Sequence, residues 1–155
     1  MRTAATFGRF RVITTGHIAL IERMAQENDR VIVAISVRSR DLRSLHLLQD
    51  RFPNVTVVYS STLFTLMNDY PEINNVYLGA DRVDLAAAIQ RYHNVDVTLL
   101  SRPEGAPSST ACRELYSQNA CLQDFIHAGL ALDEPHAMQI LARSEERRVG
   151  KECRL

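Results

Sequence analysis

Five short apolar runs, each followed by a stretch with helical spacing, are the feature that most constrains the fold of this chain. The second run, residues 31–35, reads Val-Ile-Val-Ala-Ile without a break, which is typical of a parallel strand buried on both faces. Strands that alternate with helices predict an α/β protein with a parallel sheet. We expect strands at residues 3–7, 31–35, 55–59, 76–78 and 95–100.

The helices are predicted from apolar residues that recur every three or four positions, as Ile18, Ile21 and Met24 do in the first of them. Pro53 ends the second helix, because the residue before a proline disfavours helical geometry. We expect helices at residues 17–28, 41–52, 62–70, 84–92, 121–130 and 134–141, and a further one that Ser108 caps. The predicted fold is therefore α/β, a Rossmann-like, doubly wound parallel sheet of five strands with helices on both faces.

The 155 residues suit one domain, which we expect to span residues 1–142. Residues 143–155 are rich in charge and have neither a helical nor a strand period, so we interpret them as a disordered tail from read-through or adapter sequence. The alternative is a genuine basic tail. The segment holds five of the 18 basic and three of the 18 acidic residues, which leaves a net charge of −2 on the rest. That balance gives no electrostatic support for binding nucleic acid.

Three further features bound the cellular context. The chain has no run of eighteen apolar residues, so we expect no membrane span. The first residues lack the apolar core of a signal peptide, which favours the cytoplasm. Cys112, Cys121 and Cys153 have neither the spacing of a metal site nor the even number of a disulfide framework.

A glycine-bounded loop of residues 8–17, Gly-Arg-Phe-Arg-Val-Ile-Thr-Thr-Gly-His, joins the first predicted strand to the first predicted helix. A helix start presents unpaired N–H groups and the positive end of the helix dipole, and therefore favours phosphate. Gly8 and Gly16 lack a Cβ and allow the backbone to approach an anion closely. His17 can donate a hydrogen bond to phosphate from the first turn. Thr14 either bonds a phosphate oxygen or caps the following turn.

A second phosphate-type motif, Ser108-Ser109-Thr110-x-x-Arg113, opens a later helix. Ser or Thr at a helix start can serve as a cap alone, but Arg113 one turn further on would face the same anion with its planar fork. Both motifs follow predicted strand ends, as do Asp81 and Arg82, so we expect them at the edge of the sheet where ligands bind.

The two motifs resemble the signatures of the nucleotidyltransferase superfamily that is similar to class I aminoacyl-tRNA synthetases, G-x-F-x-P-x-H/T-x-G-H and I-S-S/A-T-x-x-R. The chain is most similar to small phage-type adenylyl/cytidylyltransferase-like members, over residues 3–132, and further matches lie at residues 52–55, 79–83 and 91–94. Two positions depart from the pattern. Val12 stands where the family has Pro, and Thr14 where many members have the first His.

The resemblance implies an enzyme that transfers a nucleoside monophosphate, AMP rather than CMP, from ATP or CTP to a small phosphorylated acceptor and releases pyrophosphate. Mg²⁺ would be carried by the nucleotide phosphates, with no metal site built by the protein. The implied catalytic residues are His17, Thr14 and Arg113. The implied nucleotide-binding residues are Gly8, Arg9, Phe10, Gly16, Ser108, Ser109 and Thr110, and the implied substrate-binding residues are Asp81 and Arg82.

Several alternatives stay open at this point. Phe10 is favoured as a packing residue over a ligand contact, Arg9 is favoured over Arg11 for phosphate, and Arg102 matches a loop near the nucleotide. Asp81 either contacts the acceptor or a ribose hydroxyl, or caps the helix at 84–92. The acceptor could be nicotinamide mononucleotide, a phosphosugar, a phosphoalcohol or phosphopantetheine, and assembly into a homo-oligomer is left open. The remaining histidines are expected at the surface: His46, His93, His127 and His136.

A rival function is a catalytically weak nucleotide-binding or sensor protein of the same fold. Val12 in place of Pro favours it, because Pro would stiffen the phosphate loop.

Overall fold

The computed structural model describes residues 1–8, 10, 13–36, 48–101 and 109–141. Two compact units make up the chain. The first, here called the sheet unit, comprises Met1–Arg11 and Leu20–Glu104, and the second, the helical unit, comprises Val12–Ala19 and Gly105–Leu155.

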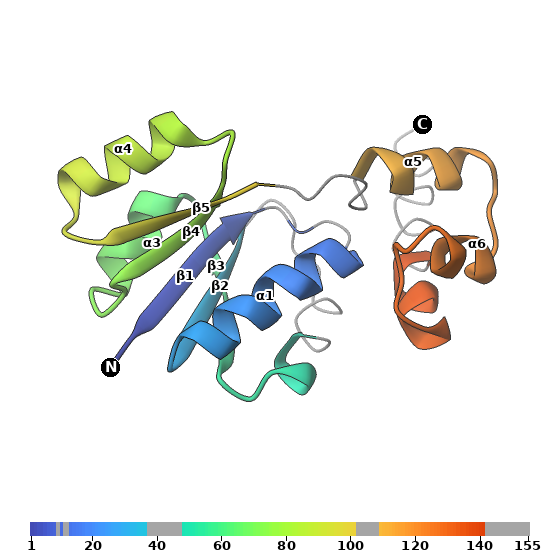
Figure 1. Cartoon of the computed structure of the whole chain (residues 1–155), viewed down its shortest axis with the longest axis horizontal. Helices are drawn as coiled ribbons and strands as arrows, with labels where there is room; N and C mark the ends of the chain where they lie inside the picture. The colour runs from blue at the N-terminus through green and yellow to red at the C-terminus, as the bar shows by residue number, and fades with distance from the viewer. Residues whose placement is uncertain (9, 11–12, 37–47, 102–108, 142–155) are drawn as a thin grey trace. The chain divides into compact units, whose positions relative to one another are not determined.

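The sheet unit is built on five parallel strands in the order β3-β2-β1-β4-β5 (Figure 1). The strands are β1 (Thr3–Gly8), β2 (Arg30–Ser36), β3 (Val55–Ser60), β4 (Asn75–Gly79) and β5 (Asp96–Leu100). Each overlaps its predicted range. The predicted α/β class and five-stranded parallel sheet are therefore confirmed.

Helices cover both faces of this sheet. On one face, α3 (Leu63–Asp69) and α4 (Val83–Tyr92) bury their apolar residues against inward-facing strand residues such as Ile32 and Val76. Residues 20–27 of α1 (Thr15–Glu27) cover the other face. There the Tyr77 hydroxyl reaches from β4 to Glu27 at the end of that helix. Residues 48–51 are helical as predicted, while residues 41–47 of the same predicted helix lie outside the described part of the chain.

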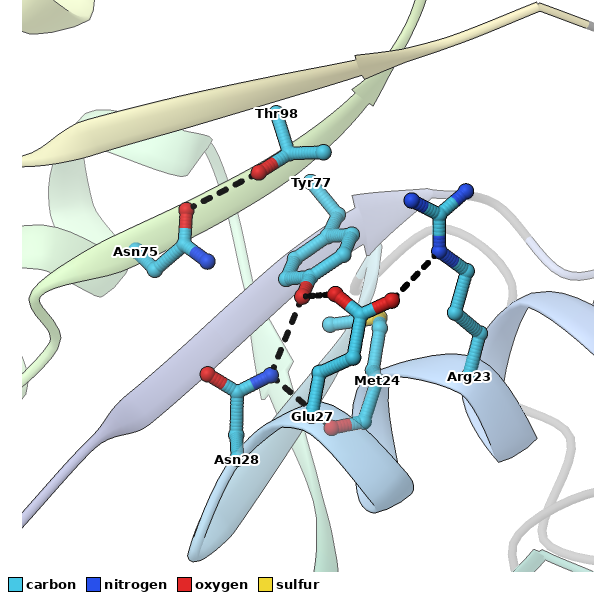
Figure 2. Close-up of polar contacts among 7 residues, drawn as sticks. All are labelled: Arg23, Met24, Glu27, Asn28, Asn75, Tyr77 and Thr98. Atoms are coloured by element: carbon cyan, nitrogen blue, oxygen red, sulfur yellow. Dashed lines mark hydrogen bonds and ion pairs between the residues drawn. The ribbon is translucent and has the colours of Figure 1, made fainter.

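A polar cluster holds the end of α1 on β4 (Figure 2). The buried Tyr77 hydroxyl donates to Glu27 at 2.7 Å and accepts from the Asn28 amide at 3.1 Å. Arg23 pairs with the other oxygen of Glu27 at 2.6 Å, one helical turn earlier. The hydrogen bond from Arg23 and that from Tyr77 lower the pKa of Glu27, and burial raises the pKa of Tyr77.

The strand order places a topological switch between β1 and β4. From β1 the chain moves outward through β2 to β3, whereas β4 leads to β5 on the opposite side. In open α/β sheets, ligands bind beyond the carboxyl ends of the strands at such a switch. The loops after Gly8 and Gly79 leave this edge of the sheet.

The helical unit contains α5 (Ser109–Ser117), α6 (Leu122–His127) and a helical segment at residues 134–141, together with residues 12–19 (Figure 1). Its core contains Phe125, on which Tyr116 packs with ring centroids 5.5 Å apart. The other buried members of this core are Cys112, Leu130, Ala131, Ala137 and Ile140.

α6 is shorter than the helix predicted at 121–130. Gly129 has a φ of 74°, a left-handed geometry that ends helices and suits glycine. Within the described residues, no helix is long and apolar enough to cross a membrane. The tail at residues 143–155 lies outside the described residues, and the boundary at 142 stays a prediction.

Candidate functional site

In the sheet unit, Gly8 and Phe10 shape the end of β1. Phe10 is 8% exposed and has a φ of 40°. A Cβ on Gly8 would lie 3.1 Å from Cε2 of the Phe10 ring, so glycine at this position leaves room for the ring to pack over the strand end. The Phe10 side chain is therefore a packing element, and its nucleotide-binding role stays a prediction. Arg9, Arg11 and Val12 lie outside the described residues.

The end of β4 carries Asp81 and Arg82, both exposed. A Cβ on Gly79 would lie 2.7 Å from Oδ1 of Asp81, so a larger residue at this position would require the exposed carboxylate to shift. Arg82 is the N-cap residue of α4, with no hydrogen bond from its side chain to the helix. The structure thus does not support the interpretation of Asp81 as the cap. Within the described residues, Asp81 makes no side-chain hydrogen bond or ion pair.

In the helical unit, Thr14 and His17 form a closed turn at the start of α1. The Thr14 N–H donates to Nδ1 of His17 at 3.1 Å, and the Thr14 hydroxyl lies 3.3 Å from the same atom. The Thr14 carbonyl accepts the N–H of Ile18, which makes it the first acceptor of the helix. Thr14 is buried and His17 half-buried. Thr14 therefore caps the turn, and a contact with phosphate stays a prediction.

This geometry selects one tautomer of His17. A neutral imidazole has one nitrogen that donates and one that accepts, and a hydrogen bond to one sets the role of the other. Nδ1 accepts from a backbone N–H, so the ring hydrogen lies on Nε2. The first turn of α1 therefore carries an imidazole whose Nε2–H is a donor, the form that can bind a phosphate oxygen. Gly16 lies in the same turn and is exposed.

The second motif lies on α5, also in the helical unit. Ser109 and Thr110 are its first two residues, and Arg113 is exposed in the following turn. The neighbouring Cys112 is buried in the core of the unit, and burial raises the pKa of its thiol. Arg102 and Ser108 lie outside the described part of the chain. The side chains of Ser109 and Thr110 also lie outside it.

The structure thus divides the predicted site residues into two sets. The sheet unit holds Gly8, Phe10, Asp81 and Arg82 at the carboxyl ends of two hydrogen-bonded strands. The helical unit holds Thr14, Gly16, His17, Ser109, Thr110 and Arg113 at the starts of two helices. Across the described ranges, no group of three or more His, Cys, Asp or Glu side chains could hold a metal ion.

The turn at Thr14 is also tied to the C-terminal part of the chain. The Thr15 N–H donates to the Leu130 carbonyl at 3.2 Å, and the Thr15 hydroxyl donates to the Gly129 carbonyl. Nε2 of His136 lies 2.8 Å from the carbonyl oxygen of Ile13. These anchors join residues that are more than a hundred positions apart in the sequence.

The prediction of a surface position for His136 is wrong, because this side chain is only 2% exposed. The sequence does contain a signal for it. In the helical segment 134–141, His136 precedes Ala137 by one position and Ile140 by four, which places it beside the buried stripe. His127 is exposed as predicted, His93 is half-buried against Phe64 with ring centroids 6.4 Å apart, and His46 lies outside the described residues.

Comparisons with known proteins bear on the fold alone. No protein-family model matches the chain, and no curated protein matches it in sequence. Among solved structures, a nicotinate-nucleotide adenylyltransferase from Vibrio parahaemolyticus matches with a TM-score of 0.56 at 19% identity, over 79% of this chain and 85% of that one.

Two pantoate-β-alanine ligases are also similar. The one from Francisella tularensis, complexed with β-γ ATP and β-alanine, has a TM-score of 0.54 at 18% identity, over 77% of this chain and 66% of that one. The one from Thermus thermophilus has a TM-score of 0.52 at 16% identity, over 83% of this chain and 75% of that one. At these identities the likeness shows a shared α/β fold.

Proposed function

We propose that the chain is a nucleotidyltransferase that transfers AMP from ATP to a small phosphorylated acceptor and releases pyrophosphate. The observation that carries the proposal is the Thr14–His17 turn, in which the Thr14 N–H holds the imidazole with Nε2–H as donor at the start of α1. A donor of this kind in the first turn of a helix, at the positive end of the helix dipole, suits an anion with several negative oxygens.

In the proposed reaction, an oxygen of the acceptor phosphate attacks the α-phosphorus of ATP. The bond between this phosphorus and the oxygen bridging to the β-phosphate breaks, and the electron pair leaves with pyrophosphate. The acceptor phosphate is largely ionised at neutral pH, since the second pKa of a phosphate monoester is about 6, so no protein base is needed. The protein's work is to position the phosphates and to stabilise the charge that develops on them.

In this reaction, each candidate site residue of the helical unit has a specific role. His17 donates from Nε2 to an α- or β-phosphate oxygen, through a hydrogen bond that strengthens as charge develops in the transition state. Arg113 holds the β- and γ-phosphates with two parallel N–H donors, and the start of α5 at Ser109 and Thr110 adds backbone donors. Gly16, which is exposed in the first turn of α1, allows close approach of the nucleotide.

For the acceptor, the candidate residues are Asp81 and Arg82, which follow the end of β4. Arg82 is an exposed cation at the carboxyl end of β4 and suits a phosphate monoester, while the neighbouring Asp81 carboxylate suits a hydroxyl donor such as a ribose. Mg²⁺ is expected to arrive on the triphosphate, because this ion keeps several waters and is commonly held by substrate phosphates plus few protein ligands. The donor base is favoured as adenine, since one similar protein is named an adenylyltransferase and another is complexed with an ATP analogue.

A pyrophosphate-release screen tests the proposal. ATP and CTP are each offered with a panel of phosphorylated acceptors, and a parallel arm offers small carboxylates, because the similar ligases act on a different type of acceptor. The expected result is pyrophosphate release that requires a phosphorylated acceptor and is lost in His17→Ala. Calorimetry that shows nucleotide binding without pyrophosphate release under any condition would instead favour the binding or sensor protein that Val12 suggests.

A further inference from the structure

The buried His136 is held from both sides of its ring. The Leu132 N–H donates to Nδ1 at 3.2 Å, so the ring hydrogen lies on Nε2. This Nε2–H donates to the carbonyl oxygen of Ile13 at 2.8 Å. The backbone of His136 is held as well, because its N–H donates to Asp133 Oδ1 at 2.9 Å at the start of the helical segment 134–141.

The carbonyl of Ile13 and the N–H of Thr14 belong to one peptide group. That group is planar and trans, so its C=O and N–H point in opposite directions. The C=O accepts from Nε2 of His136, and the N–H donates to Nδ1 of His17. A single peptide plane thus links two imidazoles, one buried and one in the proposed site. Hydrogen bonds at the two ends of an amide strengthen one another by polarisation.

We infer that His136 is a positioning residue that acts through the Ile13–Thr14 peptide to keep His17 in the tautomer with Nε2–H as donor. The effect on catalysis rests on the proposed function, whereas the effect on the tautomer does not. Rotation of the peptide would take the Thr14 N–H away from Nδ1. The ring hydrogen could then move to Nδ1 and leave a lone pair on Nε2, which repels a phosphate oxygen.

The other anchors of this turn do a different job. The bonds from Thr15 to Leu130 and to Gly129 hold the first helical residue in place, but neither involves the peptide that faces His17. Among these anchors, the bond to His136 is the one that sets the rotation of this peptide. Nothing in the proposed chemistry requires His136 to touch a substrate.

The test reads the tautomer directly, in the full chain and without nucleotide. Protein labelled with ¹⁵N in its histidine rings gives nitrogen chemical shifts that separate the two neutral tautomers and the cation, and the His17→Gln variant identifies the signals of His17. The wild type is expected to show His17 and His136 both with the hydrogen on Nε2. Either ring in the Nδ1–H form would overturn the inference.

The variants then ask whether His136 is responsible. In His136→Leu, the signals of His17 are expected to shift toward a mixture of tautomers, whereas His136→Gln, whose amide N–H can reach the Ile13 carbonyl, is expected to restore the wild-type pattern in part. His127→Leu is the matched control, since it makes the same change at an exposed position in the same unit. Unchanged His17 signals in a folded His136→Leu protein would overturn the inference. If His136→Leu does not fold, the inference is tested by the tautomers of His17 and His136 in the wild type and by the tautomer of His17 in His136→Gln.

Kinetics provide the second readout, given the proposed function. Outer partners that orient metal-binding histidines typically contribute about 10- to 100-fold to activity, and we take the same range for a partner that orients His17. We expect His136→Leu to lower kcat by a factor in this range with little change in KM for ATP, and His136→Gln to recover part of it. If His136→Leu shifts the tautomer of His17 but keeps the wild-type kcat, the effect of His136 on catalysis is contradicted and its effect on the tautomer is not. A wild-type enzyme that shows the expected tautomers but releases no pyrophosphate would sink the proposed function and leave the positioning role intact.

Discussion

The sheet unit and the helical unit hold their candidate site residues in different ways. In the sheet unit, Gly8 and Asp81 follow directly from where parallel strands end, and their neighbours are close in sequence. In the helical unit, the turn at Thr14 is held by contacts from Gly129 and His136, which are 114 and 123 residues from their partners. Local patterning thus sets the positions of the strand ends, whereas long-range hydrogen bonds hold the turn that carries His17.

The largest effect is expected in the helical unit, from His17→Ala. Loss of a donor to developing charge typically lowers turnover by about two to three orders of magnitude. The fold should survive, because His17 is half-buried and lies in the first turn of α1. Steady-state pyrophosphate release is the measurement, and His127→Ala at an exposed position is the control. Unchanged kinetics in an active preparation would remove His17 from the mechanism.

Arg113→Lys is expected to have the next largest effect, and it separates triphosphate from monophosphate binding. A Lys keeps the charge but cannot supply two parallel donors, so ATP affinity should fall about tenfold while AMP affinity changes much less. Calorimetric titrations of both nucleotides decide the matter, with Arg51→Lys on the sheet unit as control. Equal losses for ATP and AMP would show that Arg113 does not act on the β- and γ-phosphates. No loss for either nucleotide would show that Arg113 takes no part in nucleotide binding.

Tyr77→Phe tests the sheet unit, where we expect an effect on stability and none on turnover. The hydroxyl joins Glu27 to Asn28, and a buried hydrogen bond of this kind contributes about 1 kcal/mol to the free energy of unfolding (Figure 2). Urea unfolding measures the loss. Tyr59→Phe is the matched control, because Tyr59 is 38% exposed on the edge strand β3. A drop in kcat for Tyr77→Phe would show that this cluster of the sheet unit affects turnover as well as stability.

A smaller effect on the sheet unit is expected from acid. The pKa of Glu27 is lowered from its ordinary value of 4.5 by the hydrogen bonds from Arg23 and Tyr77. A lowered pKa gives stability that is present above the unfolded value and lost as the pH falls through the folded value. Between about pH 5 and pH 3, the wild type should therefore lose more stability than Glu27→Gln. Parallel pH curves for the two proteins would show that the pair with Arg23 contributes nothing, as exposed ion pairs sometimes do.

The smallest effect is expected from removing residues 143–155. The segment holds few apolar residues and so has little to bury. Thermal stability and ATP binding of the truncated chain should match those of the full chain. A clearly lower Tm would show that the tail packs on one of the units.

Strand positions were predictable because the second strand and its neighbours carry apolar runs with clear boundaries, and the chain order of strands and helices implies a parallel sheet. The place of His17 in the first turn of a helix was predictable from the apolar spacing that follows it. Its tautomer was not, because it depends on the Thr14 N–H, whose direction depends on a peptide held by His136. A single sequence shows that His136 lies near an apolar stripe, but it does not show which carbonyl the ring will meet.

Transfer of a nucleoside monophosphate is distinguished from other cleavages of ATP by following its phosphates. The enzyme is incubated with ATP labelled at the α-phosphorus and, separately, at the γ-phosphorus, together with the acceptor that supports pyrophosphate release. We predict that the α-label appears in a product joined to the acceptor, while the γ-label appears in pyrophosphate. Recovery of the γ-label as inorganic phosphate, with the α-label in ADP, would mean that the bond to the γ-phosphate is the one that breaks, and would rule out nucleotidyl transfer.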